Sequence, residues 1–286
     1  MRVWVSRTQH VHRSSRGENE PIQGPATKEC RVTNRFAIIN PSEDFRLPPP
    51  RLIIYGQPKI GKTTFGSQAP NPLFIQTEDG AAGVRVPKIP ETPCTSWDEL
   101  MTCLRTVLKE EHDRKTLVLD TVDRAERLSQ EYVLKNVFKG DQEKYMAYYK
   151  GPIMAGEKMA ELLNALDHIR NRRNMNIVLI SHDGLQKGPS TLGDDFKKLG
   201  GNVSGYAWTR MRDWADQIGH CTMDFRVVDA TAMKAGKAKR VGKQRWIYFE
   251  GEPGRDAGCR AGYELPARIE LNWSEYQEAM GDRING

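Results

Sequence analysis

Short apolar runs alternate along the chain with longer stretches in which apolar residues recur every three or four positions. The runs have the length and composition of buried strands, and they occupy residues 52–55, 73–77, 117–120 and 177–180. The helical spacing covers residues 97–108, 123–138 and 153–173. Ser96 and Glu99 form a capping box before the first of these helices. Buried strands separated by helices of this length indicate an α/β fold, with a central, mostly parallel sheet that carries helices on both faces.

The pattern changes on either side of this region. Residues 1–35 hold seven Lys/Arg and three Glu without apolar periodicity, so we expect a basic, disordered N-terminal arm; residues 1–16 also fit a mitochondrial transit peptide. We expect residues 36–286 to form one domain, with its core at about 50–230 and further strands and a tail at 231–286. Within it, residues 183–206 contain six glycines and little periodicity, which predicts a long loop.

Composition narrows the classes of protein. Hydrophobic residues make up 38% of the chain and charged residues 28%, as in a globular protein with a polar surface. No apolar run reaches the ~18–20 residues that a membrane span needs, so we expect no membrane partner. The five cysteines form no C-x-x-C pair, which argues against zinc or a disulfide framework and favours a reducing cytoplasm. The net charge of +6 permits a polyanionic partner.

The most specific motif follows the first apolar run. The pattern G-x-x-x-x-G-K-[ST] of the phosphate-binding P-loop fits eight residues, and the one after them belongs to the same expected site: Gly56, Gln57, Pro58, Lys59, Ile60, Gly61, Lys62 and Thr63, followed by Thr64. Glycines let backbone N–H groups converge on phosphate oxygens, Lys62 supplies a cation for the β- and γ-phosphates, and Thr63 supplies a hydroxyl for Mg²⁺. We therefore expect ATP and Mg²⁺ as cofactors.

Three polar residues follow the other strands, at the edge where a parallel sheet presents its ligands. Asp120 ends the third strand, where a carboxylate supports Mg²⁺ through water, although an Asp there also caps helices. Glu78 follows the second strand and is the candidate for activating the attacking water, with Asp79 as the alternative. His182 follows the fourth strand, where its side chain can contact the γ-phosphate or simply hydrogen-bond at the strand end. We interpret Asp123 as the cap of the next helix rather than as a ligand.

This order of elements resembles the RecA-like ATPases, and more narrowly the phage nucleotide-binding proteins that include RecA-like single-strand-annealing ATPases. The resemblance spans about residues 50–270 and rests on the P-loop strand, the segment 74–80, the end of the third strand at 118–121, the segment 180–182 and the segment 214–216. It implies that Glu78 is the catalytic glutamate, that His182 senses the γ-phosphate, and that the following loop contacts DNA. For a phage-encoded chain, the expected location is the cytoplasm of the bacterial host.

The resemblance also implies partners. Family members assemble side by side, with a basic residue of one subunit reaching the nucleotide of the next, so we expect a homo-oligomer with nucleotide at the interface. The basic segments 233–245 and 255–260 are the candidates for that residue. Single-stranded DNA is the expected nucleic-acid partner, and a single-strand-binding protein is a further candidate.

Two stretches mix basic and aromatic residues, as binding of single strands requires. Residues 139–150 hold three lysines and three tyrosines, and residues 197–214 combine Lys and Arg with Tyr206, Trp208 and Trp214. The spacing of Trp208, Met211 and Trp214 is equally that of a helical core stripe.

The sequence thus leads to one hypothesis and two alternatives. The hypothesis is a RecA-like, Mg-dependent ATPase that binds or anneals single-stranded DNA in recombination or repair. The first alternative is a small-molecule kinase of the nucleoside type, with a mobile, Arg-bearing lid within residues 183–212. The second is a switch that binds ATP without hydrolysing it and presents a surface to a protein partner. The chain has no guanine-reading Asn-Lys-x-Asp segment and no Leu-Ser-Gly-Gly signature, which disfavours a GTPase or an ABC-type ATPase.

Overall fold

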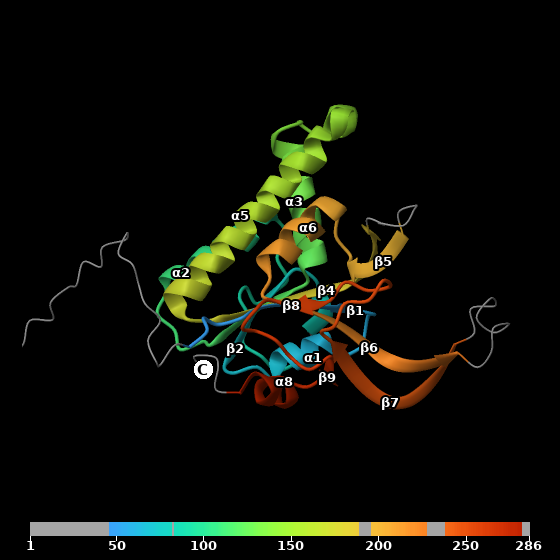
Figure 1. The fold of residues 1–286 in the computed structure, drawn as a ribbon. Helices are drawn as coiled ribbons and strands as arrows, with labels where there is room; N and C mark the ends of the chain where they lie inside the picture. Colours follow the sequence, from blue (N-terminus) through green and yellow to red (C-terminus); the bar gives the residue numbers. More distant parts are fainter. Residues whose placement is uncertain (1–45, 82, 189–195, 228–237, 282–286) are drawn as a thin grey trace, which may run out of the picture. The chain divides into compact units, whose positions relative to one another are not determined.

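The central element of the structure is a sheet whose five-stranded part is parallel. A computed structural model describes residues 46–81, 83–188, 196–227 and 238–281, all within the compact unit 44–286. The strands follow the order β2-β3-β4-β1-β6-β7-β9, and β2 through β6 in that order run parallel (Figure 1). These five are β2 (Pro72–Gln76), β3 (Thr116–Asp120), β4 (Asn176–Gly188), β1 (Arg51–Gly56) and β6 (Gln217–Val227). The predicted α/β fold of a P-loop NTPase is therefore confirmed.

The remaining strands add antiparallel pairs. β7 (Ala238–Tyr248) pairs with β6, and β9 (Arg268–Glu270) pairs with β7. β5 (Phe196–Gly201) pairs with β4, and β8 (Gly258–Cys259) pairs with β6. The sequence-predicted arm at residues 1–35 and part of the basic segment 233–245 lie outside the described residues.

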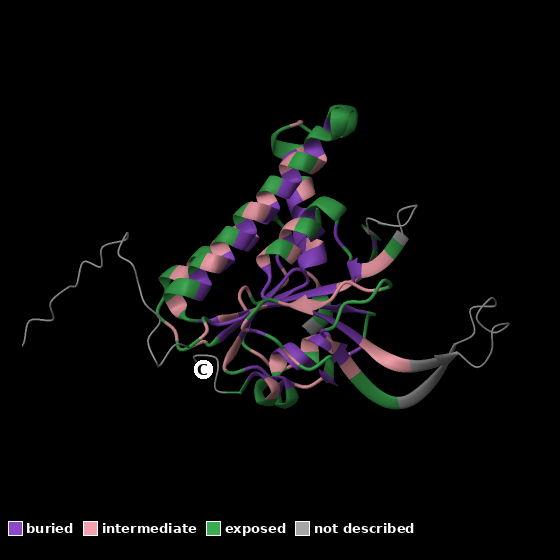
Figure 2. Cartoon of the chain, viewed as in Figure 1, coloured by how far each residue is buried: buried purple, intermediate pink, exposed green. Residues whose placement is uncertain are grey.

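Helices cover both faces of the sheet because successive residues of each strand point to opposite sides. On one face, Ile53 and Tyr55 join a core formed with four helices: α2 (Trp97–Lys109), α3 (Val122–Asn136), α5 (Lys150–Arg173) and α6 (Gly205–Trp214). On the other face, Leu52 and Ile54 pack with α1 (Lys62–Ser67) and α8 (Trp273–Met280). Figure 2 shows the buried residues concentrated in the strands and on the sheet-facing sides of these helices.

The capping box predicted before the first long helix is present in a modified form. The Ser96 side chain accepts a hydrogen bond from the Glu99 backbone N–H, which marks Ser96 as the cap of α2. The Glu99 carboxylate reaches back to the N–H of Thr95 rather than to that of Ser96. Backbone N–H groups at the start of the helix are therefore hydrogen-bonded by a Ser and a Glu side chain, the two residue types that the sequence pattern indicates.

The prediction of a long loop at residues 183–206 is wrong. β4 continues past His182 to Gly188, β5 pairs with it in an antiparallel hairpin, and Ser204 then caps α6. The glycines reflect close packing, since a Cβ at Gly201 would lie 2.6 Å from the Trp208 ring and one at Gly200 2.9 Å from it. Apolar periodicity is weak because much of the hairpin is exposed: Leu185 keeps 66% of its surface accessible.

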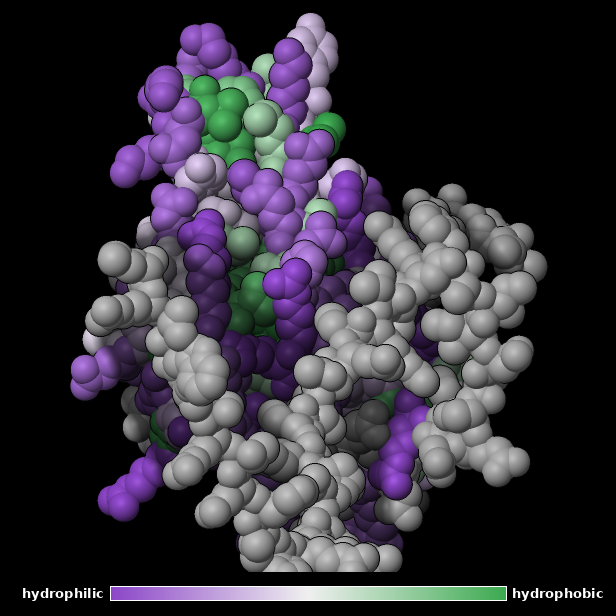
Figure 3. Space-filling model, turned by 90° about the vertical axis from the view of Figure 1, so that its left-hand side faces the viewer, coloured by the Kyte–Doolittle hydropathy of each residue, from purple (hydrophilic) through white to green (hydrophobic). Residues whose placement is uncertain are grey.

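The connection between α3 and α5 forms the far end of a helix pair. It contains α4 (Gln142–Met146) and the 3-10 turn η2 (Ala147–Tyr149). Tyr148 is 90% exposed and Tyr149 66% exposed, whereas Tyr145 is buried. Apolar side chains gather at this end among hydrophilic ones (Figure 3), and the exposed large ones there include Val137, Met146 and Ile153.

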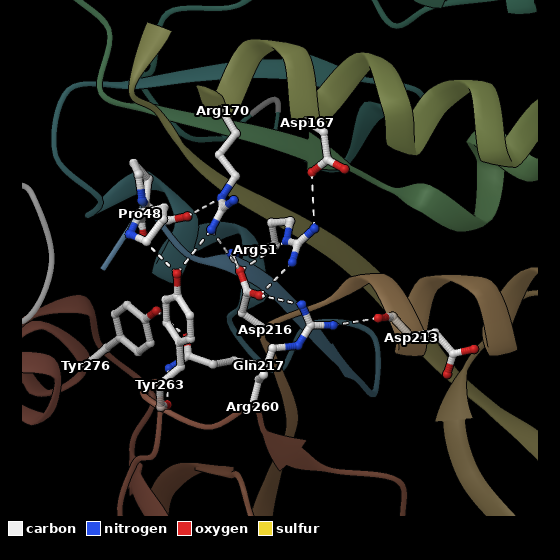
Figure 4. Close-up of polar contacts among 11 residues, drawn as sticks. Pro48, Arg51, Asp167, Arg170, Asp213, Asp216, Gln217, Arg260, Tyr263 and Tyr276 are labelled. Atoms are coloured by element: carbon white, nitrogen blue, oxygen red, sulfur yellow. Dashed lines mark hydrogen bonds and ion pairs between the residues drawn. The ribbon is translucent and has the colours of Figure 1, made fainter. Parts of the chain in front are cut away.

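A buried ionic cluster joins the starts of β1 and β6, at the opposite edge of the sheet from the P-loop. Asp216 is 2% exposed and accepts hydrogen bonds from the backbone and side chain of Arg51, and from Arg170 and Arg260 (Figure 4). Burial lowers the pKa of Arg51, but the hydrogen bonds and charges of Asp216 and Asp167 together outweigh this, and the net shift is upward. One carboxylate therefore ties together β1, α5, β6 and the segment after β8.

Candidate active site

The P-loop is shaped by two glycines, Gly56 at the end of β1 and Gly61 immediately before α1. A Cβ at Gly56 would lie 2.2 Å from the carbonyl oxygen of Cys221 on the neighbouring strand β6, so no larger residue fits there. Gly61 has a φ of 114° and precedes the first residue of α1, Lys62. The loop from Gly56 to Lys62 therefore curls at the carboxyl end of β1, as a phosphate-binding loop requires.

Lys62 is held inside this loop. Its side chain is buried, and Nζ donates hydrogen bonds to the carbonyl oxygens of Gly56 at 2.6 Å and Gln57 at 2.9 Å. Burial lowers the pKa of Lys62, while the charges of Asp120 and Asp123 raise it. The net shift is downward, and a phosphate group beside Nζ would raise this pKa because it adds negative charge to a partly desolvated site.

Thr63 and Asp120 meet across the cleft. The Thr63 hydroxyl donates a 2.7 Å hydrogen bond to Oδ2 of Asp120, which ends β3 and is 2% exposed. Burial raises the pKa of Asp120, and the bond from Thr63 partly offsets this. A hydroxyl and a desolvated carboxylate are oxygen ligands of the kind that Mg²⁺ prefers, and a cation there would relieve the cost of burying the charge. These two residues would hold the metal.

Strand register explains why the other candidates converge. Gly56 aligns with His182 on β4, and Gln76 of β2 aligns with Asp120 on β3. The carboxyl ends of β1, β2, β3 and β4 therefore lie at one edge, and Glu78 follows two residues after β2. Glu78 Oε1 lies 3.9 Å from His182 Nδ1, and its side chain is 40% exposed.

His182 is oriented by Asp123. Its Nδ1 lies 2.7 Å from Asp123 Oδ2, and the same oxygen accepts the His182 backbone N–H at 2.8 Å. The hydrogen bond to Asp123 raises the pKa of His182, while burial opposes the shift. The interpretation of Asp123 as a helix cap is wrong: Thr121 caps α3, and Asp123 is buried in its first turn. The sequence signal was ambiguous because Thr121 and Asp123 both suit a helix start.

The predicted phosphate, metal and catalytic residues share one cleft of about 440 Å³. Its wall includes six P-loop and α1 residues together with Glu78, Asp79, Asp120 and His182. It also includes Arg245 of β7, which sequence reasoning did not single out. Arg245 is far from the P-loop in the chain, and only the sheet order brings it close.

The stretches that mix basic and aromatic residues contain both core residues and exposed ones. Trp208 is 2% exposed, contacts Tyr55 edge-on and donates to Asp256, so the stripe of Trp208 and Met211 belongs to the core. Tyr148 and Tyr149 remain exposed aromatic surfaces. Lys187 and Lys197 are exposed and directly opposite each other in the β4–β5 hairpin.

The fold and the cleft together define a P-loop NTPase. A family model described as AAA domain (AAA_24) matches residues 48–261, and the chain belongs to this family. It is accordingly a P-loop AAA-type ATPase, a class that binds ATP and usually Mg²⁺. No curated protein matches the chain. Among the described helices, none is both long and apolar enough to cross a bilayer.

Proposed function

We propose that this protein is a Mg-dependent ATP hydrolase of the RecA-like, single-strand-annealing kind, which binds or anneals single-stranded DNA in recombination or repair. The observation that carries the proposal is the continuity of one strand. β4 places His182 in the nucleotide cleft and Lys187 in the exposed hairpin, about 17 Å further along an extended strand. The residue that we propose to contact the γ-phosphate and a basic surface thus share one strand.

The residues of the cleft have separable roles in this proposal. Lys62 and the P-loop N–H groups bind the phosphates, and Thr63 with Asp120 would hold Mg²⁺, which neutralises charge on the phosphate oxygens when bound. Glu78 orients the attacking water and accepts its proton. His182, fixed by Asp123, contacts the γ-phosphate and transmits its presence along β4. Homo-oligomers with nucleotide at the interface, and a single-strand-binding protein, are proposed partners.

Charge on the hairpin supports a polyanionic partner. Lys187 and Lys197 are direct cross-strand neighbours, and like charges in that position destabilise a hairpin. A phosphate backbone lying over the pair would remove this repulsion. At the end of the helix pair, exposed Tyr148 lies beside Lys150, whose Nζ is 5.9 Å from the ring, so aromatic surface for base stacking is also available.

The kinase alternative is less well supported by the arrangement of residues 183–212. That alternative needs a mobile lid, whereas the described residues there form a paired hairpin and a helix whose Trp208 and Met211 are buried. The non-hydrolysing switch differs from the proposed ATPase in its turnover, which would be negligible although ATP binds tightly.

Replacing Glu78 with Gln is expected to leave ATP affinity within about two- to threefold of wild type and to slow hydrolysis by about 10²–10⁴-fold, the contribution typical of a general base. The substitution keeps the size and polarity of a side chain that is 40% exposed. Phosphate release and fluorescent-nucleotide binding measure the two effects. Unchanged hydrolysis would remove Glu78 from this role, and negligible wild-type turnover with tight ATP binding would favour the switch.

The double variant Lys187→Gln/Lys197→Gln is expected to bind fluorescein-labelled single-stranded oligonucleotide at least about tenfold more weakly, because two phosphate contacts are lost. Fluorescence anisotropy at fixed salt, with the slowly hydrolysed analogue ATPγS present, measures this. The matched control is Lys109→Gln/Lys115→Gln, which removes the same charge from exposed positions near the opposite edge of the sheet. Equal affinities of the two double variants would contradict the assignment of the hairpin.

A further inference from the structure

Arg245 occupies an unusual position for a residue of β7. Its Nη1 lies 2.8 Å from the point where a Cβ on Gly61 would be, so the guanidinium packs directly over the P-loop glycine that precedes Lys62. The side chain is exposed and lines the same cleft as Lys62, Thr63, Asp120, Glu78 and His182. The φ of 114° at Gly61 favours glycine, and the absence of a side chain there leaves room for the guanidinium to approach the loop.

The backbone of Arg245 is well anchored. It pairs with Met223 of β6, and its carbonyl oxygen accepts a 2.9 Å hydrogen bond from the N–H of Leu271. By contrast, no ion pair or hydrogen bond of its guanidinium is recorded within the part of the chain that the structure describes. A cation that is fixed at its base and free at its tip, beside a phosphate-binding loop, is suited to bind an anion there.

Arg255 and Arg260, in the second of the two segments expected to reach a nucleotide, are placed elsewhere. Arg255 lies 4.0 Å over the Tyr248 ring and pairs with Glu252. Arg260 pairs with Asp216 at the opposite edge of the sheet. Among the basic residues of 233–245 and 255–260 whose side chains the structure describes, Arg245 alone lines the nucleotide cleft, and it does so in its own chain.

We infer that Arg245 contacts the terminal phosphates of the nucleotide bound to its own chain, so that the arginine of this ATPase acts in cis. This inference rests on the proposed ATPase function. The cleft is lined by carboxylates that end or follow β2 and β3, by Lys62 after β1, and by Arg245 from β7, two strands further along the sheet, so a triphosphate with its metal would meet cations from both the P-loop and β7. A cis arginine makes basal turnover independent of a neighbouring subunit.

The first test is nucleotide affinity of the Arg245→Gln variant, which keeps much of the side-chain length but removes the charge. We expect affinity for ATPγS with Mg²⁺ to fall about 10- to 100-fold, as for the loss of one or two charge-assisted hydrogen bonds, with a smaller loss for ADP. The control is Lys243→Gln, an exposed cation two residues earlier on β7 that does not line the cleft. Retained ADP binding shows that the variant is folded, and unchanged preference for ATPγS over ADP would overturn the inference.

The second test separates action in cis from action in trans. Arg245→Gln and Lys62→Ala proteins are mixed, and phosphate release is compared with the sum of the separate proteins. An arginine in cis predicts no gain on mixing, whereas an arginine in trans restores activity at the intact P-loops of the Arg245→Gln subunits. Restored activity would overturn the inference. If wild-type protein does not hydrolyse ATP, the proposed function fails, and the affinity test still decides the role of Arg245.

Discussion

Replacing Lys62 with Ala is expected to reduce ATP turnover by at least about 100-fold, the loss typical when one preorganised donor to a developing charge is removed. The reason lies in the position of the ammonium group. It is buried within the P-loop and already satisfied by the carbonyl oxygens of Gly56 and Gln57, so it needs little reorganisation to meet a phosphate. Alanine leaves those carbonyls facing the phosphates without a cation.

The measurement is phosphate release under saturating Mg-ATP, with nucleotide binding followed separately. Lys135→Ala is the control, because Lys135 is an exposed residue of α3 outside the cleft. Wild-type turnover in the Lys62 variant would contradict the site assignment, since no other described lysine is buried in the P-loop.

The second large effect concerns stability rather than chemistry. Replacing Asp216 with Asn is expected to lower the free energy of unfolding by about 3–5 kcal/mol, the usual cost of removing one partner from a buried ion pair. Arg51 and Arg170 have side chains only 13% and 10% exposed, so both would remain buried near each other without their shared counterion. A loss of this size is a large fraction of the ~5–15 kcal/mol that stabilises a typical domain.

Urea unfolding followed by circular dichroism measures this loss, provided that the transition stays cooperative. Asp213→Asn is the matched control, because Asp213 is exposed three residues earlier and contributes its backbone carbonyl, not its carboxylate, to Arg260. Equal stability of the two variants would show that Asp216 is not the ionic link between β1, α5 and β6.

The parallel sheet could be predicted because its signals are local. Continuous apolar runs such as Leu52 to Tyr55 occur where a strand is buried on both faces, and the P-loop follows one of them. The hairpin of β4 and β5 could not be predicted in this way. Its partner strands are polar and rich in glycine, and the close packing of Gly201 on Trp208 is a contact between distant elements.

In the site, too, residues marked by local sequence signals could be predicted, and residues placed by contacts between distant elements could not. Glu78, Asp120 and His182 are found by their position after apolar strands, because parallel strands deliver their carboxyl ends to one edge. The roles of Asp123 and Arg245 could not be found in this way, because they depend on contacts with residues that are distant in the sequence. Asp123 meets His182 through the start of α3, and Arg245 meets Gly61 only because β7 lies two strands from β1.

The most direct test of the account is steady-state ATP hydrolysis by wild-type protein with and without single-stranded DNA, beside the Lys62→Ala variant. We expect DNA to stimulate turnover in wild type and to have no effect in the variant. Turnover in wild type that is the same with and without DNA would contradict the proposed coupling of the cleft to the β4–β5 hairpin.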